Sequence, residues 1–142
     1  MKNVKNILQN KPAAVHAVTP EVSVFEALTM MMDKNISALL VCINDELQGI
    51  FTERDYARKI VLKGKSSRET LISEVMTAHP LTISPLTNID TCMNIMTDKH
   101  IRHLPVVDQG KVVGMVSIGD VVKSIIELQK ETIRQLESYI SS

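Results

Sequence analysis

Aromatic residues are scarce in this sequence: its 142 residues include no Trp, two Tyr and two Phe. Stacking of bases on aromatic side chains, a common way to bind single-stranded nucleic acid, is therefore not expected. Net charge is also lacking, because 16 basic and 16 acidic side chains cancel. No global field would draw the chain to nucleic acid or to an anionic membrane, so any anion that it binds must be held by local groups.

Cysteines and long apolar runs are few as well. Cys42 and Cys92 occupy apolar periodic positions without C-x-x-C or histidine spacing, which favours buried free thiols over a redox pair or a metal site. No apolar run approaches the roughly eighteen residues of a membrane-spanning helix, and the N-terminus has no apolar run of signal-peptide length. We expect a cytoplasmic protein with no membrane partner.

An internal repeat organises the chain. Residues 18–61 align without a gap onto residues 83–126, and the aligned pairs include Gly49 with Gly114 and Asp55 with Asp120. Each copy has the apolar pattern of a β-α-β-β-α unit, which is too small to bury its own sheet. We therefore predict an α/β fold in which two such repeats pack sheet to sheet with pseudo-twofold symmetry, leaving two equivalent clefts.

The predicted organisation has four parts: an N-terminal arm at 1–10, a first repeat at 11–68, a second repeat at 69–130 and a C-terminal helix extension at 131–142. The arm has apolar residues at helical spacing and should form a short amphipathic helix that packs on one half. The last helix is predicted to end near Ile140. It is longer than its own repeat needs, so its last turns should cover the other repeat or a second chain.

Local signals place the first elements of each repeat. Ser23 followed by Glu26 predicts the start of a helix, and Asn35 its end. The apolar residues of this helix predict its buried face: Val24, Phe25, Leu28, Met31 and Met32. In the second repeat, residues 80–84 are predicted as the first strand.

A Ser/Thr-x-x-Asp motif stands at the predicted strand-to-helix turn of both repeats, as Thr52-x-x-Asp55 and Ser117-x-x-Asp120. Free backbone N–H groups and the helix dipole favour an anion at such a turn, and an aspartate can accept hydrogen bonds from ribose hydroxyls. The same spacing also fits a capping box, in which both side chains only close the helix start. The two roles are compatible, and the recurrence of the whole unit favours a nucleotide site.

Three segments carry a resemblance to a known family: Thr-Glu-Arg-Asp-Tyr-Ala-Arg-Lys from Thr52, Ile-Arg-His-Leu-Pro-Val-Val-Asp from Ile101, and Val-Ser-Ile-Gly-Asp from Val116. Together with the ungapped repeat, they resemble a tandem CBS-domain pair, the Bateman module, over about residues 10–130. The likeness is to the small stand-alone CBS-pair proteins of bacteria and plant organelles. The resemblance implies a non-enzymatic binder of adenine nucleotides, most often AMP and in some relatives ATP or NAD, with no required cofactor or metal.

The resemblance also implies roles for residues of the second repeat. Asp120 would hold the ribose diol and Ser117 the phosphate, while Arg102 and His103 fall where the family places basic groups for phosphate. A salt bridge of Arg102 to Asp98 or Asp108, and a satisfied histidine at the edge of the core, are the alternatives for this basic pair. The other implied ligand-binding residues lie near the adenine or within the same motifs: Thr82, Ile83, Pro105, Met115 and Gly119.

The first repeat departs from this pattern. Thr52 and Asp55 repeat the phosphate and sugar pair, but Ser37 and Ala38 stand where the second repeat has Arg102 and His103. Arg54 and Arg58 would supply the missing charge, or they are simply solvated. Because an arginine–phosphate pair is about twice as strong as a neutral hydrogen bond, we expect the second cleft to bind more tightly.

The leading functional hypothesis is a homodimeric sensor of adenine nucleotides whose occupancy changes its surface for an effector protein. The alternative is an interaction or scaffold protein whose clefts stay empty. An enzyme is disfavoured, because the four histidines are scattered and no Ser/His/Asp arrangement or cluster of metal ligands occurs.

Overall fold

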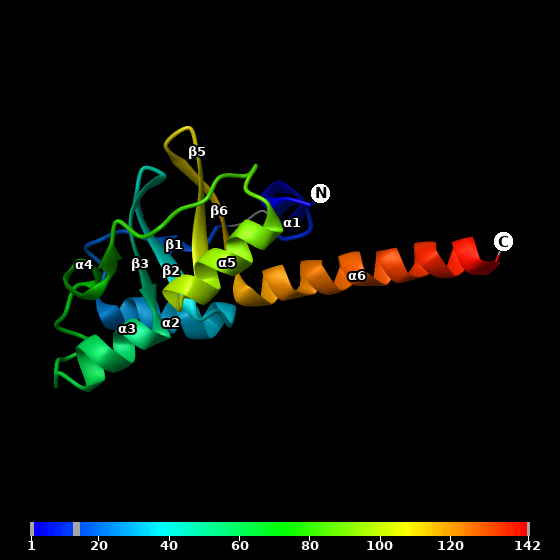
Figure 1. The fold of residues 1–142 in the computed structure, drawn as a ribbon. Helices are drawn as coiled ribbons and strands as arrows, with labels where there is room; N and C mark the ends of the chain where they lie inside the picture. Colours follow the sequence, from blue (N-terminus) through cyan, green and yellow to red (C-terminus); the bar gives the residue numbers. More distant parts are fainter. Residues whose placement is uncertain (1, 13–14, 142) are drawn as a thin grey trace. The chain divides into compact units, whose positions relative to one another are not determined.

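The computed structural model describes residues 2–12 and 15–141 (Figure 1). The chain forms two compact units, each named here after the repeat that supplies most of it. The first-repeat unit consists of Ala14–Thr82 and Val107–Val113, and the second-repeat unit of Met1–Ala13, Ile83–Val106 and Gly114–Ser142. The predicted N-terminal arm therefore belongs to the unit of the second repeat.

The first-repeat unit is built on a four-stranded sheet in the order β1-β2-β3-β4. Strand β1 pairs parallel to β2, and the other neighbours are antiparallel. Its elements in chain order are β1 (Ala17–Val18), α2 (Val24–Lys34), β2 (Ala38–Ile43), β3 (Glu46–Thr52), α3 (Glu53–Asp55), the π-helix η1 (Tyr56–Val61), α4 (Ile72–Val75) and β4 (Thr77–Ala78).

Helix α2 begins and ends where the sequence predicts. The Ser23 side chain accepts a hydrogen bond from the Glu26 amide, and Asn35 ends the helix in the left-handed region with φ of 53°. Its buried residues are Val24, Ala27 and Met31, which share one helical face.

Two residues of the buried face predicted for α2 are exposed. Phe25 is 40% exposed, beneath the Arg68 guanidinium at 3.9 Å from its ring centroid, and Met32 is 76% exposed. Each follows a buried residue by one position, and a single step turns the helix by about 100°, which takes both side chains off the buried stripe. The prediction was therefore wrong for these two side chains.

Among its described residues, the second-repeat unit contains three helices and a two-stranded sheet formed by β5 and β6. Its elements are α1 (Val4–Gln9), α5 (Ile89–Lys99), β5 (His103–Asp108), β6 (Lys111–Ser117) and α6 (Ile118–Ser141); the tip of the β5–β6 hairpin lies in the first-repeat unit. The strand predicted at 80–84 is reduced to one parallel bridge between Ile83 and Val106. Pro80 and Pro85 have no amide hydrogen, so they cannot extend this pairing.

The arm is part of the core of the second-repeat unit. Val4 is fully buried and Ile7 is 7% exposed in a cluster with residues of α5, β5, β6 and α6. The amides of Val4 and Lys5 donate to the carbonyls of Thr87 and Pro85 at 2.9 Å, which fixes the helix start on the loop before α5. The short amphipathic helix predicted for the arm is thus present, and it completes a core instead of only covering one.

Close backbone approach explains the repeated glycines Gly49 and Gly114. A Cβ atom at Gly49 would lie 2.6 Å from the Met76 sulfur and 2.8 Å from the Thr77 carbonyl oxygen, and one at Gly114 would lie 2.7 Å from a methyl group of Leu8. Any larger residue would push these segments apart. Each repeat thus uses a glycine to bring a segment from outside its own β-hairpin against its second strand.

Both cysteines are free, Cys92 buried and Cys42 half-buried, and burial raises the pKa of each thiol.

Among the described residues, no helix combines the length and apolarity needed to span a membrane.

Candidate functional site

The turn from β6 into α6 places Ser117 and Asp120 as the motif predicts. The Ser117 amide donates to Asp120 Oδ2 at 2.9 Å, and the Asp120 amide donates to Ser117 Oγ at 3.1 Å. This reciprocal pair is the capping-box alternative considered for the sequence. The cap is therefore present in the structure, and the nucleotide role of the two side chains stays a prediction.

A third residue, Lys11, completes this turn, and the sequence analysis missed it. Its ammonium group lies 2.8 Å from Asp120 Oδ2 and donates to the Met115 carbonyl oxygen at 2.8 Å. Lys11 stands directly after the arm, 109 residues before Asp120. Nothing in the spacing of the sequence could pair the two residues, because the contact depends on where the arm docks.

The lysine sets the charge state of the acid. Burial alone would raise the pKa of Asp120, but the hydrogen bonds from Lys11 and Ser117 and the charge of Lys11 outweigh burial and lower this pKa below its usual value. The carboxylate is thus held ionised at neutral pH. Its side chain is 23% exposed and that of Lys11 34%, so the pair remains accessible to solvent.

The basic residues predicted beside this turn differ in their environments. Arg102 is exposed, its carbonyl accepts a hydrogen bond from the Ile118 amide at 2.8 Å, and within the described chain it forms no salt bridge to Asp98 or Asp108. Half-buried His103 has its pKa lowered by burial and by the charges of Lys11 and Arg102, against the opposing effect of Asp120. A neutral imidazole can donate one hydrogen bond to a phosphate but adds no charge.

The other residues predicted for the second site are spread over several elements. Ile83 and Pro105 are buried and joined by a hydrogen bond from the Ile83 amide to the Pro105 carbonyl at 3.0 Å. Met115 is half-buried on β6 and Gly119 is exposed in the first turn of α6. Thr82 is exposed and belongs to the first-repeat unit.

In the first repeat, Thr52 and Asp55 form the same capping box with more partners. Asp55 Oδ2 accepts from the Thr52 amide at 3.0 Å and from its hydroxyl at 3.1 Å. Oδ1 accepts from the Thr77 hydroxyl at 3.3 Å and lies 3.1 Å from the Lys59 ammonium, which also donates to the Val75 carbonyl at 2.9 Å. Both oxygens are thus engaged and Asp55 is only 8% exposed. The predicted Arg54 and Arg58 are exposed.

The two acids are therefore neutralised in different ways. At both turns a lysine binds the aspartate and a backbone carbonyl, but Lys59 lies one turn along the same helical segment, whereas Lys11 comes from the segment that follows α1. The residue that aligns with Lys59 in the second repeat is Ser124, which is buried and uncharged. Asp120 is the more accessible of the two acids because its lysine comes from a separate segment and fewer groups surround it.

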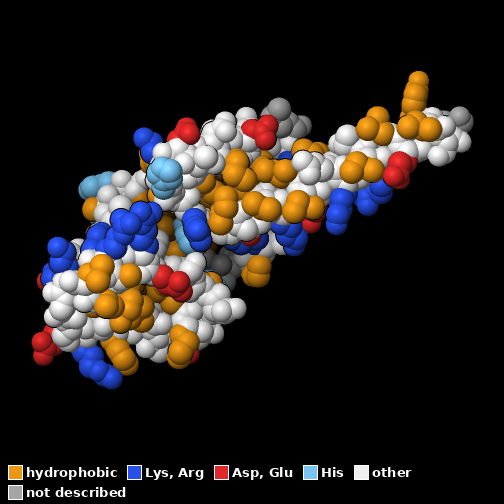
Figure 2. Space-filling view, turned by 60° about the horizontal axis from the view of Figure 1, so that its bottom comes forward, with side chains coloured by type: hydrophobic (Ala, Val, Ile, Leu, Met, Phe, Trp, Pro, Cys, Tyr) orange, Lys and Arg blue, Asp and Glu red, His pale blue; other side chains and the backbone are white. Residues whose placement is uncertain are grey.

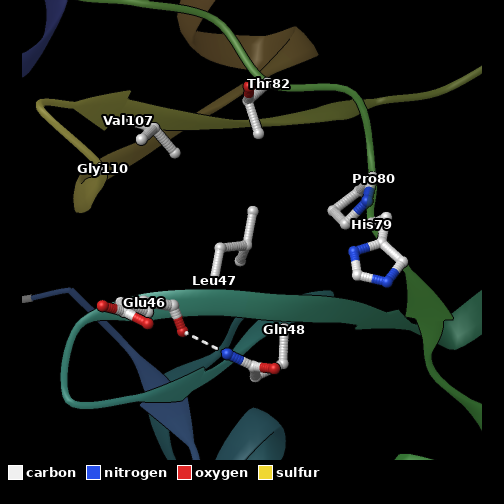
Figure 3. Close-up of a pocket in the computed structure, with 8 residues that line it drawn as sticks. All are labelled: Glu46, Leu47, Gln48, His79, Pro80, Thr82, Val107 and Gly110. Carbon is white, nitrogen blue, oxygen red and sulfur yellow. Dashed lines mark hydrogen bonds between the residues drawn. The ribbon is translucent and has the colours of Figure 1, made fainter.

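A pocket of about 400 Å³ lies within the first-repeat unit (Figure 3). Its lining residues are Glu46, Leu47, Gln48, His79, Pro80, Thr82, Val107 and Gly110. Figure 3 shows the Gln48 side chain turned toward the backbone of Glu46, to whose carbonyl it donates at 3.2 Å. Of the predicted ligand-binding residues this pocket contains Thr82, and it contains neither Asp55 nor Asp120.

The repeated strand-turn-helix unit, with its glycine and its capped aspartate, defines the class of protein. The sequence profile of the CBS domain family matches residues 4–62 and 72–127, which together make up most of the chain. The chain belongs to the CBS domain family, and it carries two of these domains. This confirms the family that the resemblance predicts.

Individual relatives agree with this assignment. The chain is 40% identical over 127 residues to the mitochondrial CBS domain-containing protein CBSX3 of Arabidopsis thaliana, an alignment that covers 86% of this chain and 62% of that protein. The chain thus spans less than two-thirds of the length of this relative. Among solved structures, a protein with CBS domains from Burkholderia ambifaria MC40-6 has a TM-score of 0.85 at 46% identity, with 89% of this chain and 95% of that one covered. CBSX2, solved in complex with AMP, has a TM-score of 0.74 at 26% identity over 91% of this chain and 99% of that one.

Proposed function

We propose that this chain is a non-enzymatic regulatory module that senses adenine nucleotides, with AMP as the first candidate and ATP or NAD as others. The observation that carries the proposal is the β6–α6 turn, where an ionised and partly exposed Asp120 lies with Ser117 at the amino end of a helix. The solved complex of the similar protein CBSX2 with AMP supports this choice of ligand. The proposal includes no catalytic residue and no required cofactor or metal.

In the proposed site, Asp120 accepts hydrogen bonds from the ribose hydroxyls. Ser117 binds the phosphate at the amino end of α6, where the helix dipole favours an anion. The amides of Ile118 and Asp120 already donate to the Arg102 carbonyl and to Ser117 Oγ. Arg102, exposed beside this turn, supplies the positive charge, and His103 a hydrogen-bond donor. The family pattern places Thr82, Ile83 and Met115 near the adenine, and the proposed ligand-binding residues also include Pro105 and Gly119.

A second, weaker site is proposed at the corresponding turn of the first repeat, with Thr52, Arg54, Asp55 and Arg58. Asp55 is nearly buried and both of its oxygens already accept hydrogen bonds, so a ribose would have to displace existing partners. Arg54, within this turn, and Arg58, one helical turn further on, are exposed and would contribute positive charge. The second-repeat site should therefore fill first.

As a sensor, the chain would act as a homodimer and transmit its occupancy to an effector protein. Such transmission requires that the nucleotide bind one arrangement of the module more tightly than another. Lys11, which follows the arm, is a candidate for this coupling because it contacts the carboxylate that the ribose would use.

A thermal-stability screen with AMP, ATP, NAD and adenosine tests the proposed function. A nucleotide present at one hundred times its dissociation constant should add about 2.7 kcal/mol to the free energy of unfolding. AMP should give the largest stabilisation in the panel. Unchanged unfolding with every compound, confirmed by calorimetry, would contradict nucleotide sensing.

That negative result would favour the alternative function, an interaction or scaffold protein with unoccupied clefts. A specific observation supports this alternative: both aspartates serve as helix caps and both are already paired with a lysine.

Replacing Lys11 by Met should strengthen nucleotide binding. The ammonium group competes with the ribose for Asp120, and a partly exposed ion pair contributes up to about 1 kcal/mol, so affinity should rise about threefold to fivefold. Calorimetry with adenosine and with AMP measures this effect, and Lys11→Arg, which keeps the charge, should bind like the wild type. If Lys11→Met weakens AMP binding but leaves adenosine binding unchanged, the lysine contacts the phosphate and the competition model is wrong.

A further inference from the structure

Helix α6 continues far beyond its contacts with its own unit. Val121 and Ser124 are buried against that unit, but every residue from Ile126 to Ser141 is exposed. In Figure 1 this part of α6 extends away from α5 and α1 as one continuous helix. An unsupported helix of this length is only marginally stable in water, so a partner is needed to stabilise it.

The exposed part of α6 carries a regular apolar stripe. Residues at alternating steps of four and three form one line along the helix, and Figure 2 shows hydrophobic side chains following α6. The members of this stripe, called the α6 stripe below, are Val122, Ile126, Gln129, Ile133, Leu136 and Ile140. Five of the six are apolar, with exposed fractions of 54% for Ile133, 57% for Leu136 and 80% for Ile140.

The spacing of the α6 stripe identifies the kind of surface that it fits. Steps of four and three average 3.5 residues, which is the heptad period of two helices that wind around each other. In heptad letters, Ile126, Ile133 and Ile140 occupy position a, and Val122, Gln129 and Leu136 position d. A stripe that only packed on the sheet of its own domain would need no such strict repeat over its full length.

We propose that the α6 stripe is a homodimerisation surface on which α6 of a second copy of this chain packs antiparallel. A twofold axis brings a stripe against an identical stripe, so a stripe in which five of six residues are apolar meets an equally apolar surface. The exposed apolar residues would then insert between those of the partner helix.

Charges beside the α6 stripe decide whether two α6 helices pack parallel or antiparallel. The residues at position e are Lys123, Lys130 and Glu137, all exposed. In an antiparallel pair, position e of one helix lies beside position e of the other, so Glu137 meets a lysine of the second copy. In a parallel pair, Glu137 would lie beside position g, where the uncharged Thr132 stands. Charge complementarity therefore favours the antiparallel arrangement.

The first experiment measures self-association of the full chain by sedimentation equilibrium without nucleotide, so its result does not depend on the proposed sensing function. Ile133→Asp puts a charge in the centre of the stripe and should raise the dimer dissociation constant at least about 100-fold. Gln135→Asp, a matched change to an exposed position outside the stripe, should leave it within about threefold. The proposal is overturned if the wild-type chain stays monomeric at about 100-fold the lowest concentration that sedimentation equilibrium can detect. It is also overturned if Ile133→Asp and Gln135→Asp associate equally well.

The second experiment tests the direction and keeps the stripe intact. Glu137→Lys makes all three e positions basic and should weaken the antiparallel dimer about tenfold, whereas Glu131→Lys, a matched change at the outward position f, should have little effect. Reversing all three charges, with Lys123→Glu, Lys130→Glu and Glu137→Lys together, should restore association. Equal effects of Glu137→Lys and Glu131→Lys, or a failure of the triple variant to recover, would overturn the antiparallel assignment.

Discussion

An Asp120→Asn chain should bind AMP about 100-fold more weakly than the wild-type chain. The carboxylate offers two charged acceptors to a ribose diol, whereas an amide offers one neutral oxygen, and hydrogen bonds to a charged group are worth about 1.5–3 kcal/mol. The remaining oxygen can still accept from the Ser117 amide, which in the wild type donates to Asp120 Oδ2 at 2.9 Å. The helix cap should therefore persist while the ligand contact is lost.

Calorimetry with AMP measures this difference, and the thermal midpoint without ligand checks that the cap is intact. Asp90→Asn is the matched control, because Asp90 is an exposed acid in the first turn of α5, another helix of the same unit. It should leave AMP affinity unchanged. Undiminished binding by Asp120→Asn would show that this residue is a helix cap and nothing more.

Asp55→Ala should lower the free energy of unfolding by about 2–3 kcal/mol. Asp55 is 8% exposed and accepts hydrogen bonds from the Thr52 amide and hydroxyl and from the Thr77 hydroxyl. The substitution leaves these donors without an acceptor and removes the partner of the Lys59 ammonium. Because Lys59 is 41% exposed, water can replace part of the lost contact, which keeps the effect below that of a fully buried pair.

Urea unfolding compares this variant with Asp120→Ala. The second change removes a similar cap from a more exposed position and should cost only about 1 kcal/mol. A larger loss of unfolding free energy for Asp120→Ala than for Asp55→Ala would contradict the view that Asp55 is mainly structural and Asp120 mainly accessible to ligand.

Local chemistry made the helix boundaries predictable. Ser23 and Asn35 act within a few residues of themselves, so the start and end of α2 could be read without the fold. The duplicated Ser/Thr-x-x-Asp turns were found for the same reason. Burial of single side chains was predicted less well: Met32 was assigned to the buried face although it stands one position after Met31, a step of about 100° around the helix.

The parts of the site that escaped prediction depend on contacts between distant segments. Lys11 reaches Asp120 only because α1 docks beside α5, and no pattern along the chain encodes that position. The pairing of Lys59 with Asp55 could have been predicted from the sequence, since the two residues are four apart on one helical segment. The ligand contacts proposed for Arg102, His103 and Met115 remain predictions.

The segments that make up each unit affect the order in which the protein can fold during synthesis. Val4 and Ile7 are synthesised long before core partners such as Val116 and Val121, which follow them only after both β-hairpins have begun. Helix α1 can therefore pack into its core only after β6 and the start of α6 have been synthesised. Cutting the chain between its repeats would separate that helix from the core that it completes, so neither fragment would carry a full set of its own interior residues.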